Sequence, residues 1–223
     1  MTPGEFAKLR DYIYRKTGLY FTEQKLYYVE RRVAERMQET GHTDFRGYFA
    51  YLRFDPAGTE FQHLVNALTV NETYFFREYS QLKCFAEEVL PDLIARKNPE
   101  ARHLRVWCAG CATGEEAYTL AIILQEMTGG LEPPVGWEVH ATDINTRSLE
   151  HARRGVYDAR SVRCVPEPYL KRYFAVQGNR YRVNEFLRPG VRFYPLNLAD
   201  GDAMRRMQNF DAIFCRNVLI YFD

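Results

Sequence analysis

The 223-residue sequence lacks any apolar run near the ~20 residues that a membrane-spanning helix needs. Its amino terminus, Met1–Phe6, has no signal-peptide pattern. We therefore expect a cytoplasmic protein with no membrane insertion. Basic and acidic residues nearly balance, 30 against 29, and a formal net charge of +1 does not favour nucleic acid as a partner.

The cysteines also lack a paired pattern. The five cysteines are odd in number and scattered, which indicates reduced thiols rather than a disulfide framework. Cys108 and Cys111 form a Cys-x-x-Cys motif, but no second closely spaced pair of cysteines or histidines follows to complete a zinc site. We interpret both as small apolar side chains in a tight loop and expect no metal; thioredoxin-like redox chemistry is the alternative.

Hydrophobic residues make up 46% of the chain, enough for one large core or two small ones. Helical periodicity dominates residues 1–70, with helices expected at 5–14, 24–38, 45–53 and 60–68. Strand-like runs appear only after residue 100. We expect a helical domain at 1–70, a linker and connecting helix at 71–100, and a second domain at 101–223.

The second domain has the α/β pattern. Expected strands at 104–109, 136–141, 191–195 and 210–215 alternate with helical segments, which is typical of a parallel sheet built from βαβ units. One interruption is antiparallel in character. Two short strand-like runs flank Gly178 and Asn179, a hairpin signal that predicts a small β-subdomain at about 172–190.

Residues 105–119 read as a buried strand, a glycine loop and the start of a helix. Gly110 and Gly114 let the backbone approach a ligand closely at the carboxyl end of the strand. Glu115 and Glu116 in the first helical turn would repel a phosphate and favour hydroxyls or an ammonium group. S-adenosylmethionine carries both of those groups.

Asp143 ends the next expected strand, about thirty residues further on. In this position an acidic side chain can accept both ribose hydroxyls of a nucleoside cofactor. The alternative is that Asp143 only caps the following helix, which runs through Ser148 and Ala152.

Two further segments carry polar groups beside aromatic ones. In 71–78, polar residues alternate with Tyr74, Phe75 and Phe76, which can also be read as core between two domains. In 211–223, a buried strand is followed by Arg216, Asn217 and Tyr221. Polar groups after a strand mark a site in this class of fold.

Taken together, these segments resemble the CheR family, S-adenosylmethionine-dependent methyltransferases that esterify glutamate side chains of bacterial chemoreceptors. The resemblance spans nearly the whole chain. It rests on Asn71-x-Thr73-x-Phe-Phe-Arg77-Glu, Trp107-Cys-Ala-Gly-Cys-Ala-Thr-Gly-Glu-Glu116, Ala141-Thr-Asp143-Ile, Asn197-Leu198 and Phe214-Cys-Arg216-Asn217-Val-Leu-Ile-Tyr221-Phe-Asp. It implies a Rossmann-like class I methyltransferase sheet behind an all-helical domain.

The resemblance also implies site residues. Glu116 and Asp143 would hold the methionine amino group and the ribose, in an order left open, while Asn197 and Leu198 would flank the adenine. Arg77 and Tyr221 would act on the substrate carboxylate. The full set expected around the cofactor and its product, S-adenosylhomocysteine, is Asn71, Thr73, Arg77, Gly110, Glu116, Asp143, Asn197, Leu198, Arg216 and Asn217.

The implied partner is a methyl-accepting chemotaxis receptor. Arg31, Arg32 and Arg36 would form the basic docking surface, although charged residues on an amphipathic helix are also simply its solvated face. The hairpin loop is short, which favours an enzyme that needs no receptor tail peptide, and we expect a monomer.

Members of this family normally continue beyond the segment that ends here at Asp223, so we expect the carboxyl-terminal end of the sheet to be missing. The leading alternative function is a non-catalytic module that binds S-adenosylmethionine or S-adenosylhomocysteine, or docks receptors. A second alternative is a methyltransferase acting on nucleic acid or on a small molecule.

Overall fold

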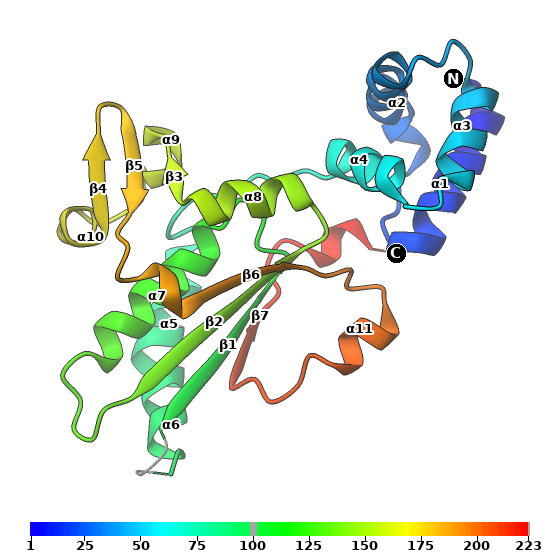
Figure 1. Cartoon of the computed structure of the whole chain (residues 1–223). Coiled ribbons are helices and arrows are strands. Elements are labelled where there is room, and N and C mark those ends of the chain that lie inside the picture. The colour runs from blue at the N-terminus through cyan, green and yellow to red at the C-terminus, as the bar shows by residue number, and fades with distance from the viewer. Residues whose placement is uncertain (99–101, 223) are drawn as a thin grey trace.

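The computed structural model describes residues 1–98 and 102–222. Figure 1 shows a group of helices from the first seventy residues beside a larger part that is built on a sheet. Each part has its own cluster of buried apolar side chains. Within the described residues, no helix is long and apolar enough to cross a membrane.

Four helices form the first part: α1 (Pro3–Thr17), α2 (Leu26–Thr40), α3 (Phe45–Phe54) and α4 (Thr59–Leu68). A 3₁₀ turn, η1 (Glu23–Lys25), leads into α2. The sequence sets these boundaries. Thr2 and Glu5 form a capping box at the start of α1, and Gly18 ends that helix in the left-handed conformation. The helical periodicity expected for residues 1–70 is confirmed.

The connection to the sheet consists of α5 (Tyr79–Cys84), a π-helical turn η2 (Phe85–Val89) and α6 (Leu90–Ala95). Phe85 and Leu90 join the core beneath the sheet. This segment therefore packs with the second part of the chain.

The main sheet has four parallel strands in the order β6-β2-β1-β7. They are β1 (His103–Ala109), β2 (Gly136–Asp143), β6 (Val191–Pro195) and β7 (Ala212–Phe214), and each coincides closely with an expected strand. Helix α7 (Glu115–Thr128) packs against one face of the sheet. Its residues 117–124 are all apolar or uncharged, and all of them are buried. Helices α8 (Thr146–Arg154) and α11 (Gly201–Arg205) complete the crossovers. The Rossmann-like α/β fold is confirmed.

A second sheet, with the order β3-β5-β4, stands apart from the first (Figure 1). It contains β3 (Val156–Tyr157), β4 (Phe174–Gln177) and β5 (Arg180–Val183), with α9 (Ala159–Val162), α10 (Glu167–Tyr173) and the turn η3 (Arg188–Gly190) around it. Strands β4 and β5 pair antiparallel across Gly178 and Asn179. The predicted hairpin is confirmed.

Two sets of contacts join the helical part to the sheet. Helix α4 meets the start of α8, where the Asn66 side chain donates to Thr146 Oγ1 at 2.9 Å and accepts from the Thr146 backbone N–H at 3.0 Å. Elsewhere Leu19 forms an antiparallel bridge with Phe222, just after the turn η4 (Leu219–Tyr221). Leu19 and Phe222 both line the candidate site.

Candidate active site

A cavity of about 610 Å³ lies between the helical part and the carboxyl ends of β1 and β2. Its walls come from the segments 17–28, 68–77, 110–116, 143–144, 196–198 and 216–222. The structure brings together at this cavity the residues that the sequence nominated for the cofactor and the reaction: Asn71, Thr73, Arg77, Gly110, Glu116, Asp143, Asn197, Leu198, Arg216, Asn217 and Tyr221.

The glycine loop after β1 folds back onto the end of β2. The backbone N–H groups of Gly110 and Cys111 both donate to the Thr142 carbonyl, at 2.8 and 2.9 Å. Gly110 has a φ of +76°, and a Cβ there would lie 2.4 Å from Val218 Cγ2. Only glycine satisfies both the conformation and the space at this position.

Asp143 braces the same loop from the end of β2. Its Oδ2 accepts from the Ala112 N–H at 2.7 Å and its Oδ1 from the Asn145 N–H at 2.8 Å. The residue that caps α8 is Asn145, which accepts from the Ser148 N–H, so the capping alternative for Asp143 is wrong. Burial raises the pKa of Asp143, and its carboxylate keeps lone pairs free for further donors.

Glu116 faces the cavity from the first turn of α7. Its Oε2 accepts from Arg216 Nη1 at 2.6 Å and its Oε1 from the Cys108 thiol at 3.4 Å. Burial raises the pKa of Glu116, and the nearby Arg216 opposes that effect. The Arg216 side chain is 10% exposed and also donates to Gln81 Oε1 and to the Arg77 carbonyl. Arg216 thus links α5, α7 and the segment before α5.

The segment 71–78 contributes side chains both to the core and to the cavity. Phe75 and Phe76 are buried in the core, as the alternative interpretation had it. Arg77 lines the cavity, and its Nη1 donates to the Glu72 carbonyl at 2.6 Å. Asn217 Nδ2 holds the end of this segment by donating to Glu78 Oε1 at 3.2 Å.

Another part of the cavity wall forms where residues 197 and 221 contact the end of α1 and the residues that follow it. Asn197 Nδ2 donates to the Lys16 carbonyl at 2.7 Å. The Tyr221 carbonyl accepts from the Tyr20 N–H at 3.0 Å. Residues of both parts of the molecule therefore close the cavity.

Comparison with known proteins agrees with this architecture. Residues 4–69 match the model of the CheR methyltransferase all-alpha domain, and residues 71–223 match that of the CheR methyltransferase SAM-binding domain. This chain belongs to the CheR methyltransferase family. It is an S-adenosylmethionine-dependent methyltransferase of chemotaxis.

Similar family members come from several bacteria. The chain is 43% identical to chemotaxis protein methyltransferase 2 of Vibrio cholerae, over 100% of this chain and 77% of that protein. It is 39% identical to chemotaxis protein methyltransferase 2 of Pseudomonas aeruginosa, over 100% and 77%. It is 35% identical to the chemotaxis protein methyltransferase of Escherichia coli, over 100% and 76%.

In this CheR-family chain the sequence reasoning missed one wall of the cavity. Leu19, Tyr20, Phe21, Thr22, Lys25 and Tyr28 all line it from the start of the helical domain. Tyr28 is held there because its hydroxyl donates to the Leu68 carbonyl at 3.1 Å. No local pattern distinguishes these residues from an ordinary helix connection, so only the tertiary structure identifies them.

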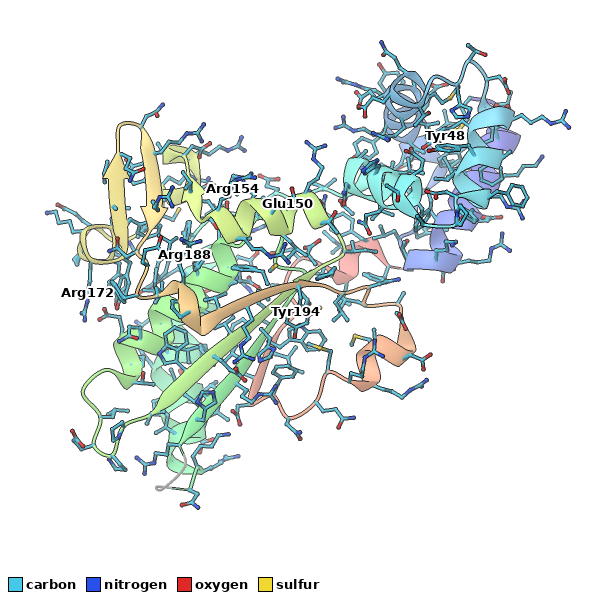
Figure 2. All side chains as sticks on the ribbon, viewed as in Figure 1. Tyr48, Glu150, Arg154, Arg172, Arg188 and Tyr194 are labelled. Atoms are coloured by element: carbon cyan, nitrogen blue, oxygen red, sulfur yellow. The ribbon has the colours of Figure 1, made fainter. Side chains whose placement is uncertain are left out.

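The three docking arginines lie outside the cavity on α2. Arg31 is 68% exposed and pairs with Glu35 at 3.2 Å, and Arg32 pairs with the same carboxylate. Arg36 differs from the expectation. Its side chain is 12% exposed and pairs at 2.6 Å with buried Glu60, which also accepts from the Tyr48 hydroxyl within the helical domain. Tyr48 is labelled in Figure 2.

Cys108 and Cys111 are free thiols, and burial raises the pKa of both well above the ordinary value. A protonated, buried thiol is neither a good nucleophile nor a good metal ligand. In the described part of the chain, no group of three or more histidine, cysteine, aspartate or glutamate residues is placed to hold a metal ion.

Proposed function

We propose that this methyltransferase esterifies glutamate side chains of methyl-accepting chemotaxis receptors. The observation that carries the proposal is Arg77, a guanidinium at the wall of a cavity that also presents the carboxylates of Glu116 and Asp143. Its Nη2 makes no ion pair or hydrogen bond within residues 1–98 and 102–222. It is therefore available to an incoming carboxylate.

The residues present fit the cofactor. Asp143 is buried and Glu116 is partly buried, and burial raises the pKa of both carboxyl groups. The cavity therefore favours hydrogen-bond donors and positive charge over phosphate. We assign the ribose hydroxyls to Asp143, because it stands at the carboxyl end of β2. Glu116 then takes the methionine ammonium group, and Asn197 and Leu198 flank the adenine.

When bound, S-adenosylmethionine supplies a methyl group activated by its sulfonium. A glutamate side chain is ionised at neutral pH and needs no general base. The task of the protein is therefore orientation, which can contribute up to about 7–11 kcal/mol in the best cases. Arg77 suits it, since a guanidinium fork matches the two oxygens of a carboxylate. To Tyr221, which also lines the cavity, we assign the steering of one of those oxygens.

Arg77 must hold the substrate only moderately. Charge disappears as the carboxylate attacks, so a strong ion pair would stabilise the ground state more than the transition state. The Glu72 carbonyl and the Glu78 carboxylate, 3.9 Å from Arg77 Nε, moderate its charge.

Docking is proposed for the exposed part of α2. A receptor surface that presents glutamates is acidic, and Arg31 and Arg32 offer complementary charge. Arg36 is not included, because Glu60 already neutralises it inside the domain.

The test is transfer of a labelled methyl group from S-adenosylmethionine to purified chemoreceptor, followed by mild alkali. An ester releases labelled methanol under these conditions. Label that resists alkali, or receptor that stays unlabelled, would contradict the proposal. Titration with S-adenosylhomocysteine, repeated with Asp143→Ala, tests the cofactor site separately; one-to-one binding weakened by the substitution is expected.

Arg77→Ala should reduce the rate of transfer at saturating cofactor at least 100-fold while leaving S-adenosylhomocysteine affinity within about threefold. Arg77→Lys should recover little, because an ammonium cannot reproduce the planar fork. A wild-type rate in Arg77→Ala would remove this side chain from the reaction.

A further inference from the structure

Glu115 is the member of the acidic pair that the cavity does not use. It is 3% exposed and does not line the cavity. Its Oε2 accepts from Thr113 Oγ1 at 2.6 Å and its Oε1 from Ser161 Oγ at 3.1 Å. Among the described residues no lysine or arginine pairs with it, and burial raises its pKa. A buried carboxylate with no cationic partner is costly to keep.

Two consecutive backbone N–H groups of the segment 71–77 donate hydrogen bonds to residues that are themselves bonded to Glu115. The Phe75 N–H donates to the Ser161 carbonyl at 3.0 Å, and Ser161 is the residue whose hydroxyl bonds the Glu115 carboxylate. The Phe76 N–H donates to Thr119 Oγ1 at 3.1 Å, and that hydroxyl donates to the Glu115 carbonyl at 2.7 Å.

These bonds act where the chain turns. Phe76 has a φ of +58°, a left-handed conformation that a bulky residue adopts only when its surroundings impose it. The Phe75 ring packs edge-on against Tyr157 at 4.9 Å and Phe174 at 5.0 Å between centroids. The residue that follows the turn is Arg77, so its direction depends on these contacts.

We infer that Glu115 is a positioning residue for methyl transfer: its carboxylate holds Ser161, and its backbone carbonyl holds Thr119, where these two residues fix the backbone before Arg77. The inference rests on the proposed role of Arg77. Glu115 does not reach the cavity, so it affects the orientation of the substrate carboxylate and not the affinity for the cofactor.

Two substitutions test this on the full chain. Glu115→Ala removes the carboxylate, and Thr119→Val removes the hydroxyl that accepts from Phe76. Both should lower kcat at saturating cofactor by about 10–100-fold, while the Kd for S-adenosylhomocysteine stays within about threefold. Glu115→Gln should restore most of kcat, because its amide can serve both hydroxyls, which donate and accept.

Thr128→Val is the matched control. Thr128 is also buried on α7 and donates to a carbonyl four residues back, Leu124, but no hydrogen bond joins it to the segment 71–77. It should keep wild-type kcat. If folded Glu115→Ala and Thr119→Val also keep wild-type kcat, or if Glu115→Ala loses cofactor affinity in parallel with kcat, the inference is wrong.

Amide hydrogen exchange of the segment 71–77 gives a second readout that needs no substrate. Exchange should be faster in Glu115→Ala and Thr119→Val than in wild type and Thr128→Val. Unchanged exchange would overturn the inference. If the wild-type chain methylates no receptor, the proposed function fails, and exchange still decides whether Glu115 fixes this segment.

Discussion

At the scale of single residues, backbone strain is concentrated around the cavity. Five non-glycine residues in the described chain have positive φ. Three of them, Phe76, Ala112 and Asn217, lie in the segments that form the site, and Glu78 directly follows one of these segments. Each such conformation costs on the order of 1–3 kcal/mol. Hydrogen bonds hold them: the Ala112 N–H bonds Asp143, and Asn217 bonds Glu78.

The glycine loop gives the first prediction. Gly110→Ala should destabilise the protein by more than about 2 kcal/mol and abolish S-adenosylhomocysteine binding, because a Cβ there meets Val218 at 2.4 Å. Gly178→Ala is the control: φ is also positive, +61°, but nothing lies within 4 Å of the added Cβ. It should cost only about 1–2 kcal/mol and leave binding intact. Denaturant unfolding and calorimetric titration measure both, and equal effects of the two changes would contradict the argument.

The residue scale also shows what the sequence could and could not predict. Glu115 and Glu116 are adjacent, so a rotation of about 100° between them on a helix sends one into the cavity and the other into the core. Which of the two faces the cavity can be predicted only when the orientation of α7 is known. Arg36 has a solvent-facing pattern in the sequence, but its partner Glu60 is on another helix.

At the scale of elements, a charged cluster joins β1, β2 and β6 on the face of the sheet opposite α7. Glu138 accepts from Arg105 Nε at 2.8 Å, pairs with Arg192 at 3.1 Å and lies 3.0 Å from His140 Nε2. Tyr194, labelled in Figure 2, extends the cluster, with its hydroxyl 2.9 Å from His140 Nδ1. Burial alone would raise the pKa of Glu138, but His140, Arg105 and Arg192 lower it to about 2.

This pKa predicts a pH-dependent contribution to stability. Because the folded pKa is depressed from 4.5 to about 2, the contribution is complete above pH 4.5 and is lost as the pH falls towards 2. Glu138→Gln should therefore lower the free energy of unfolding by about 1–2 kcal/mol at pH 7, less than the full shift because the cluster is partly solvated. Urea unfolding should show a smaller difference at pH 3 than at pH 7.

Glu167→Gln provides the comparison for that experiment. Glu167 pairs with Lys171 on the surface, and both side chains are 75% exposed. Its replacement should leave the free energy of unfolding nearly unchanged at both pH values. A loss for Glu138→Gln that does not depend on pH would assign the effect to packing instead of charge.

Elements were the most predictable level of this structure. The four parallel strands and the hairpin at Gly178 follow from short-range patterns of apolar and turn residues. The short helices α9 and α10 around the second sheet could not be predicted from such patterns, because segments of 4 and 7 residues carry too little periodicity.

At the scale of the whole molecule, buried amides lock the two domains together directly behind Asp143. Asn145 is 2% exposed. Its Nδ2 donates to the Asn66 carbonyl at 3.1 Å and to Thr69 Oγ1 at 2.7 Å, while its Oδ1 caps α8. The position of the helical domain is thus tied to the carboxylate that we assign to the ribose.

Asn145→Ala should accordingly lower the free energy of unfolding by about 2–3 kcal/mol and weaken S-adenosylhomocysteine binding about tenfold, because it removes a cap and two bonds between domains. Asp44→Ala removes only a cap, that of α3, far from the junction. It should cost about 1 kcal/mol and leave binding unchanged. Equal binding by both variants would show that the junction does not shape the cavity.

Contacts between the two domains were the least predictable feature from the sequence. The segments expected in the cleft came from the linker and the second domain, yet Leu19 and Tyr20 also form its wall. Their pairing with Tyr221 and Phe222 spans the whole chain, and no local pattern encodes such a contact.

The bridge between Leu19 and Phe222 has a consequence for how the protein is made. Residues 17–28 leave the ribosome early, and the residues that complete their cavity wall, 216–222, leave about 190 residues later. At the usual pace of synthesis, about 5–20 residues per second, the helical domain waits on the order of 10–40 s for that partner. The helices can fold in that interval, but a nascent chain cannot enclose the cofactor until β7 and η4 emerge.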